Sequence, residues 1–316
     1  MSQMSFASLA FESKKKVTRR EQFLNEMDKV IPWDAFEKLI EPYYPKAGNG
    51  RRPMPLGSML RIYFMQQWFN LSDPGMEDQL YESISMQRFA GLEVGQNPIP
   101  DETTILHFRH LLEKHNVTEQ MFKLVRDQLQ DKGILLRGGT ITDATLIHAP
   151  ESTKNKSKAR DKDMSVTRKG SKWHFGMKAH VGVDSKSGLV HTLRCTTASV
   201  HDSKMVDELL HGDEEEVYGD KAYADESRRA GLESKGVRWR ISVKAARGRQ
   251  LTESQKLWNK DCNRTRARVE FVFGVVKNLW GHYKVRYKGL TKNTAQFFTL
   301  FTLCNLYMAR NSLTRV

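Results

Sequence analysis

Apolar residues recur every three to four positions along the first part of the chain, the spacing of one buried helical face. In the segment Pro55–Asn70 they stand at positions 56, 59, 60, 63 and 64. The residues Ser72-Asp73-Pro74 then offer a cap with proline at the first helical position, so a helix is expected over Gly75–Ala90. Two more helices are predicted, one that begins at Pro100–Thr104 and one over Val117–Gln130. Residues 1–135 are therefore predicted to form an all-helical N-terminal domain.

Beyond Gly138-Gly139 the pattern changes to the alternation and short apolar runs of β-strands. Short helices and then a long one, roughly over residues 252–280, are expected between and after the strands, in the order β-β-β-α-β-α-β-α. That order is expected of an α/β, ribonuclease H-like fold with a mixed five-stranded sheet and flanking helices, here over residues 136–316. Residues 151–170 are polar and lysine-rich and are predicted to be a mobile loop. The five predicted strands are Thr140–Ile147, His174–Asp184, Leu189–Thr197, a strand that ends at Glu216–Asp220, and Val237–Val243.

Charge is concentrated in two segments of the chain. The whole sequence has a net charge of +14 and a pI near 9.6. Residues 235–310 contain 17 lysines and arginines against three acids, and residues 151–178 contain nine against three. Solvated basic faces are common, but two such segments favour binding to a phosphate backbone.

Three separate cysteines without a C-x-x-C pair indicate neither a disulfide framework nor a cysteine zinc site, and favour a reducing cytoplasm. The N-terminus does not resemble a secretory signal. The apolar segment 295–309 is too short and too polar to span a bilayer, so a buried C-terminal helix and no membrane association are expected.

Three acidic residues stand where the predicted fold would bring them together. Asp143 lies on the first strand, Asp220 at the end of the fourth, and Glu270 on the long helix beside its apolar stripe. Carboxylates at neighbouring strand ends can bridge Mg²⁺, which prefers oxygen ligands. Each acid also has a structural reading: Asp143 as a strand-end hydrogen-bonding group, Asp220 as a turn residue, and Glu270 as the ion-pair partner of Arg266.

Five segments together closely resemble DDE transposases of bacterial insertion sequences, specifically the insertion-sequence-five group. They are TTILHFRHLLE (103–113), TITDATLI (140–147), KWHFGMKAHVGVD (172–184), VYGDKAYAD (217–225) and NRTRARVEFVFGVVK (263–277). In that family the third acid lies in a helical motif Y-x₂-R-x₃-E-x₆-K, which Arg266, Glu270 and Lys277 match in spacing. Asn263 stands where the family usually has tyrosine.

The resemblance implies an enzyme with Asp143, Asp220 and Glu270 as catalytic residues and metal ligands. They would hold two Mg²⁺ ions per site, with Mn²⁺ able to substitute. Such an enzyme binds the terminal inverted repeats of its element as double-stranded DNA, frees 3′-OH ends and joins them to target DNA, as a homodimer or larger assembly. The expected DNA contacts come from both predicted domains: Arg266, Lys277, Lys221, Arg264, Arg268, Lys178, Arg51, Arg52 and Arg109.

Several alternatives stay open at this point. The N-terminal helices could form a helix-turn-helix DNA reader, with Arg61 and Arg88 also available, or a bundle that only packs against the catalytic domain. The chain could be a nuclease of the same fold that does not join strands, or a domesticated transposase that acts as a DNA-binding regulator.

Individual residues also have two readings. Trp239 is either a core tryptophan or a residue that stacks on a displaced base. His201-Asp202-Ser203 is expected to cap a helix through Asp202 or Ser203. Four histidines near the predicted site could belong to a His/Asp metal hydrolase, although no H-x-H or H-E-x-x-H spacing supports it: His148, His174, His180 and His201.

Overall fold

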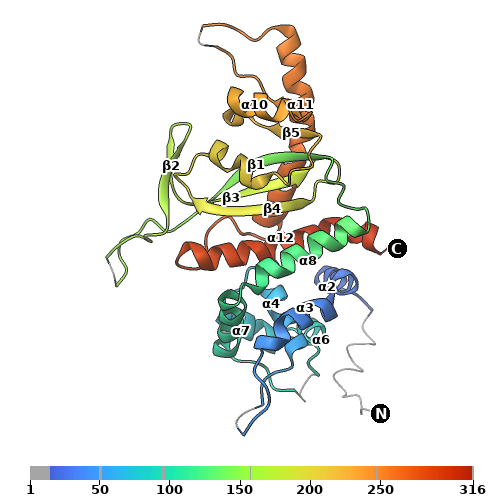
Figure 1. Cartoon of the computed structure of the whole chain (residues 1–316). Helices are drawn as coiled ribbons and strands as arrows, with labels where there is room; N and C mark the ends of the chain where they lie inside the picture. The colour runs from blue at the N-terminus through green and yellow to red at the C-terminus, as the bar shows by residue number, and fades with distance from the viewer. Residues whose placement is uncertain (1–14, 50–51, 94–96, 157, 247, 315–316) are drawn as a thin grey trace. The chain divides into compact units, whose positions relative to one another are not determined.

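A computed structural model describes residues 15–49, 52–93, 97–156, 158–246 and 248–314 (Figure 1). The chain divides into two compact units. The first comprises Met1–Phe122 with Leu306–Val316, and the second comprises Lys123–Asn305. None of the helices in the described ranges is long and apolar enough to cross a membrane.

The first unit is helical, as the apolar spacing predicts. The helix expected over Pro55–Asn70 is α4 (Leu56–Trp68), and most of its side chains are buried. Ser72 caps the next helix by accepting a hydrogen bond from the Gly75 backbone N–H. That helix is interrupted at Ser83, whose extended backbone separates α5 from α6. The remaining bounds in and next to this unit are α2 (Arg19–Val30), α3 (Trp33–Ile40), η1 (Glu41–Tyr43), α5 (Asp73–Glu82), α6 (Ile84–Phe89), α7 (Glu102–Lys114) and α8 (Val117–Asp131).

The second unit is built on a mixed sheet whose core has the strand order β4-β3-β1-β5-β6. The pairs β1–β3 and β3–β4 are antiparallel, whereas β1–β5 and β5–β6 are parallel. This is the ribonuclease H-like arrangement that the strand order predicts, and all five expected strands are present. Their bounds are β1 (Gly139–His148), β3 (Lys172–Asp184), β4 (Val190–Thr197), β5 (Glu216–Gly219) and β6 (Arg238–Ile241).

A sixth strand departs from the sequence prediction. β2 (Ser165–Lys169) lies in the segment expected to be a loop, and it pairs antiparallel with the start of β3. A turn of Gly170 and Ser171 joins the two strands, and Gly170 takes a φ of +62°, which glycine adopts without a steric penalty. The sequence of this strand shows no apolar alternation, because its half-buried positions are the polar residues Ser165 and Thr167.

Helices cover both faces of the sheet. Helix α11 (Glu253–Gly274), extended by a π-helical turn over Val275–Leu279, packs along β1, β5 and β6. Its start is fixed by a capping box between Thr252 and Gln255. On the opposite face, a cluster of buried residues around Val217 joins the two parallel strands to the short helices. Those helices are η2 (Asp202–Met205), α9 (Val206–Leu209), η3 (Lys221–Tyr223) and α10 (Glu226–Glu233), and the C-terminal helix is α12 (Leu290–Leu313).

Candidate active site

The sheet register brings Asp143 and Asp220 to equivalent places on neighbouring parallel strands. Ile141 of β1 pairs with Tyr218 of β5, and each aspartate lies two residues further along its own strand direction. Parallel neighbours lie about 4.8 Å apart. Burial is the main cause that raises the pKa of the Asp143 carboxyl, and the nearby charge of Asp220 raises it further. Two carboxylates therefore share the carboxyl-end edge of these strands.

Gly219 allows close packing at this edge of the sheet. A Cβ at this position would lie 2.8 Å from Ile241 Cδ1 and 3.1 Å from Thr142 Oγ1. The absence of a side chain thus permits the close packing that orients Asp220. The Asp220 carboxylate then caps η3, because its Oδ1 accepts a hydrogen bond from the Ala222 backbone N–H at 2.7 Å.

Arg266 connects the strand carboxylates to helix α11. Its Nη1 lies 2.7 Å from Asp143 Oδ2, and its Nη2 lies 3.4 Å from Glu270 Oε1. The Glu270 side chain is 66% exposed, so it is more solvated than its place beside the apolar stripe predicts. The pairing of Arg266 with Glu270, expected as the structural reading of Glu270, is present together with the contact to Asp143. Within the ranges that the structure describes, no three His, Cys, Asp or Glu side chains already converge as a metal-holding group.

The Asp143 carboxyl lies in an environment that opposes its charge. Burial raises its pKa to about 6, against the lowering effects of the Ala144 N–H and the Arg266 guanidinium. The Ala144 N–H donates to Oδ1 at 2.8 Å. A cation at this edge would restore the stability of the carboxylate form.

The sequence did not identify Tyr223 as a residue of this region, and it gave Asp202 only the role of a helix cap. The Tyr223 side chain is 1% exposed, and its hydroxyl has no hydrogen-bond partner in the described part of the chain. Burial raises the pKa of this hydroxyl most. The neighbouring carboxylates of Asp143, Asp202 and Asp220 raise it further. A buried, unpaired hydroxyl thus faces the acidic edge. Its place in the sequence, three residues after Asp220, is the signal that could have identified it.

Asp202 is an ion-pair partner rather than the expected cap. The capping side chain of η2 is His201, whose Nδ1 accepts from the Ser203 N–H. Asp202 Oδ1 instead lies 2.9 Å from Lys178 Nζ and 3.8 Å from Nδ1 of the fully buried His180. The prediction that Asp202 or Ser203 caps the helix was wrong, because the imidazole of His201 reaches the same backbone donor.

Apart from Arg266, the basic residues of the second unit that were expected to contact DNA fall into two groups. The first group is engaged within the protein: Lys178 with Asp202, Lys277 with Thr145 Oγ1 and the Leu146 carbonyl at 3.1 Å each, and Arg268 with the Ser185 carbonyl at 2.6 Å. Burial of Lys277 lowers its pKa. Lys221 and Arg264 form the second group, with exposed side chains available to a polyanion.

The arginines of the first unit differ in the same way. Arg52 is exposed, whereas Arg51 lies outside the described residues. Arg109 is only 5% exposed and pairs with Asp73 at 3.1 Å and Glu113 at 2.9 Å. This placement does not support the expected DNA contact, because the buried guanidinium pairs with two half-buried carboxylates.

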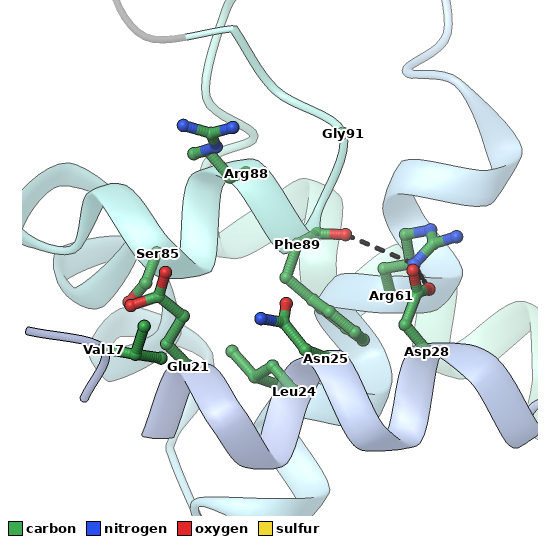
Figure 2. A pocket seen from close by; sticks show the side chains of 10 residues that line it. All are labelled: Val17, Glu21, Leu24, Asn25, Asp28, Arg61, Ser85, Arg88, Phe89 and Gly91. Atoms are coloured by element: carbon green, nitrogen blue, oxygen red, sulfur yellow. Dashed lines mark hydrogen bonds and ion pairs between the residues drawn. The ribbon is translucent and has the colours of Figure 1, made fainter. Parts of the chain in front are cut away.

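Arg61 and Arg88 line a pocket of about 490 Å³ in the first unit (Figure 2). Arg61 pairs with Asp28 and lies over the Trp33 ring, 3.9 Å from its centroid. The guanidinium of Arg61 is thus held in place by an ion pair and an aromatic face.

Trp239 is a core residue. It is 8% exposed and packs with Val217 and Ile241 in the cluster that joins the parallel strands to the helices. Stacking on a displaced base is therefore excluded for this tryptophan. Asn263, at the position where tyrosine was expected, accepts a hydrogen bond from the Ser242 hydroxyl at 3.2 Å.

Comparison with known proteins identifies both parts of the chain. Residues 135–306, more than half of the sequence, match the family described as "Transposase DDE domain". Residues 11–111 match the family described as "Transposase domain (DUF772)". A cryo-EM structure of a piggyBac transposase synaptic complex with hairpin DNA is similar at 12% identity with a TM-score of 0.45, over 92% of this chain and 73% of that one.

Proposed function

Because this chain belongs to the family of transposases with a DDE domain, we propose that it is the transposase of an insertion sequence of the insertion-sequence-five group. It binds the terminal inverted repeats of the element, cleaves the DNA to free 3′-OH ends, and joins these ends to target DNA. The observation that carries the proposal is the meeting of Asp143 and Asp220 on adjacent parallel strands, with Arg266 linking Asp143 to Glu270 on α11.

We assign Asp143, Asp220 and Glu270 as the metal ligands of this reaction. The donors suit Mg²⁺ or Mn²⁺, since all three are carboxylates, and the unpaired Tyr223 hydroxyl at the same edge suits a hydrated ion. Two divalent ions would activate the attacking oxygen and stabilise the departing 3′ oxygen. A bound ion would share Asp143 and Glu270 with Arg266, because the guanidinium takes only one oxygen of each carboxylate.

The chain's own residues would orient the DNA at this edge. Arg266, held by Asp143 and Glu270, would place a cation beside the scissile phosphate, where a planar guanidinium can bind phosphate oxygens. Lys221 and Arg264 are exposed and supply phosphate contacts beside the carboxylates. Lys277 holds β1 against the π-helical turn and acts by positioning Asp143, two residues from its partner Thr145.

Residues 1–135 are proposed to recognise the element ends and residues 136–316 to carry out the chemistry. The two family matches, over 11–111 and 135–306, support this division. Since two ends must be joined to one target, the working form is proposed to be a homodimer or larger assembly on DNA.

The experiment that tests the proposal is a strand-transfer assay with duplexes taken from the DNA that flanks the reading frame. Wild type with Mg²⁺ is expected to yield cleaved and joined products. Asp143→Asn should bind the same ends and make neither product, since the amide still accepts from Ala144 but loses the charge. Cleavage without joining would indicate a nuclease of this fold, binding without cleavage a regulator, and unchanged cleavage by Asp143→Asn would contradict the ligand assignment.

A further inference from the structure

The hairpin formed by β2 and the start of β3 presents an exposed tryptophan between basic residues. Trp173 is 66% exposed. Among the described large hydrophobic residues of the sheet-containing unit, Leu257 has the same exposed fraction and none has a higher one. It pairs in register with Arg168, whose guanidinium lies 5.8 Å from the Trp173 ring centroid. Burial of this exposed ring against a partner would be favourable, because it removes a large apolar surface from water.

The charge of this hairpin specifies the kind of partner. Arg168, Lys169 and Lys172 surround the turn, and no acidic residue occurs from Ser165 to Val183. All three basic side chains are exposed. Burial and then the positive charge of Lys169 lower the pKa of Lys277 in the π-helical turn. The tip therefore combines an aromatic face with a local excess of positive charge, which are the two components of a single-strand nucleic-acid contact.

The hairpin projects from the rest of the sheet (Figure 1). Because it includes the start of β3, its distance from the carboxylates can be measured along that strand. Asp143 pairs with Val181 of β3, and Trp173 lies eight residues before Val181 on the same strand. At about 3.3 Å per residue the separation along the strand is at most about 26 Å. This corresponds to roughly eight nucleotide steps at about 3.4 Å each.

We propose that the β2–β3 hairpin is a DNA-contacting element in which Trp173 stacks on an unpaired base up to about eight nucleotides from the cleaved end, while Arg168, Lys169 and Lys172 bind the flanking phosphates. The inference rests on the proposed function, because cutting and joining create strands with unpaired bases. Stacking on Trp173 tolerates any base, since every base offers a π face.

The test is fluorescence anisotropy with a short labelled single strand and the matching duplex, in EDTA so that no strand is cut. Trp173→Ala is expected to weaken single-strand binding about 5- to 100-fold, with a smaller effect on the duplex. Trp173→Phe should retain most of the affinity, because a phenyl ring still stacks. Val166→Ala, a truncation of another exposed apolar side chain of the same hairpin, should bind as wild type does.

The salt dependence separates the roles of the two kinds of side chain. Trp173→Ala should leave the slope of log affinity against log salt unchanged. Replacing Arg168, Lys169 and Lys172 together by glutamine should reduce that slope by about 2 for a single strand. Equal affinity of Trp173→Ala and wild type would overturn the inference.

A change in self-association would overturn it as well. If sedimentation shows that Trp173→Ala alters the oligomeric state while its DNA affinity is unchanged, the exposed ring serves a protein contact. In either case a wild type that still joins DNA leaves the transposase proposal standing. A wild type that binds no DNA would overturn both.

Discussion

Nη1 of Arg266 lies 2.7 Å from Oδ2 of Asp143, although 123 residues separate the two in the chain. The contact joins helix α11 to strand β1 at the edge of the sheet where Asp220 also lies. Because the second amino group of Arg266 reaches Glu270, one planar side chain spans two of the three proposed ligands. A guanidinium can span them in this way, whereas an ammonium group is a point charge.

Arg266→Lys should therefore impair catalysis more than binding. The charge remains, but the two-pronged contact is lost, and misplacement of a reacting group by about 1 Å can cost about 100-fold in rate. We expect single-turnover cleavage to fall by roughly that factor while the affinity for the duplex changes little. Arg264→Lys, on an exposed position of the same helix, is the matched control, and an equal loss in both variants would contradict a special role for Arg266.

Asp220→Asn should separate metal binding from folding. Asparagine caps helices about as well as aspartate, so the bond to Ala222 N–H and the free energy of unfolding should be preserved within about 0.5 kcal/mol. A ligand that binds only the native state raises the melting temperature. Mg²⁺ should raise that of wild type and have a much smaller effect on Asp220→Asn, and EDTA should cancel the difference. An undiminished Mg²⁺ shift in the variant would remove Asp220 from the ligand set.

The meeting of Asp143 and Asp220 could be predicted from the sequence. The strands are recognised by their residue pattern, and their order in the fold places the ends of the first and fourth strands side by side. The sequence does not predict that Arg266 occupies an oxygen of Asp143, since that contact depends on the rotation of α11 against β1. The strand β2 was missed because its polar, basic residues resemble a loop. Arg109 and Trp239 were also beyond prediction from the sequence. An arginine is usually on the surface, and a tryptophan can be either buried or exposed. Both residues are buried here, which depends on how the helices and strands pack.

His191 should make the stability of the sheet-containing unit depend on pH. Its Nε2 lies 3.1 Å from Thr140 Oγ1, and because that hydroxyl donates to Glu214, Nε2–H is the donor. Burial lowers the pKa of His191 from 6.5 to about 3. The unfolded state then binds more protons between these pH values, so stability is complete above pH 6.5 and is lost as the pH falls.

His191→Gln keeps a donor towards Thr140 and removes the titration. Between pH 6.5 and 5, the free energy of unfolding should fall less steeply in the variant than in wild type, by up to about 1.4 kcal/mol per pH unit. Urea unfolding at several pH values measures this slope. His201→Gln, which replaces an exposed imidazole, should keep the wild-type slope. Parallel curves for wild type and His191→Gln would show that other groups determine the acid sensitivity.

Arg109→Met should destabilise the helical unit without a direct effect on DNA binding. The guanidinium is the shared partner of Asp73 and Glu113, and the Glu113 side chain is itself only 11% exposed. Removing one member of a buried ion pair leaves carboxylates without compensation and typically costs about 3–5 kcal/mol. Arg52→Met removes an exposed cation of the same unit and should change the free energy of unfolding by less than about 0.5 kcal/mol.

The order of the two variants should be reversed for DNA binding, where Arg52→Met is expected to have the larger effect. At a temperature where both are folded, Arg52→Met should reduce the salt dependence of binding to an element end by up to about one unit of slope, whereas Arg109→Met should leave it unchanged. Adding Glu113→Gln to Arg109→Met should recover part of the lost stability, since it removes one of the uncompensated charges. A different result would contradict this assignment: Arg109→Met lowers the salt slope and leaves the free energy of unfolding unchanged. The arginine would then have to leave its buried position and its ion pairs to contact phosphate when DNA binds.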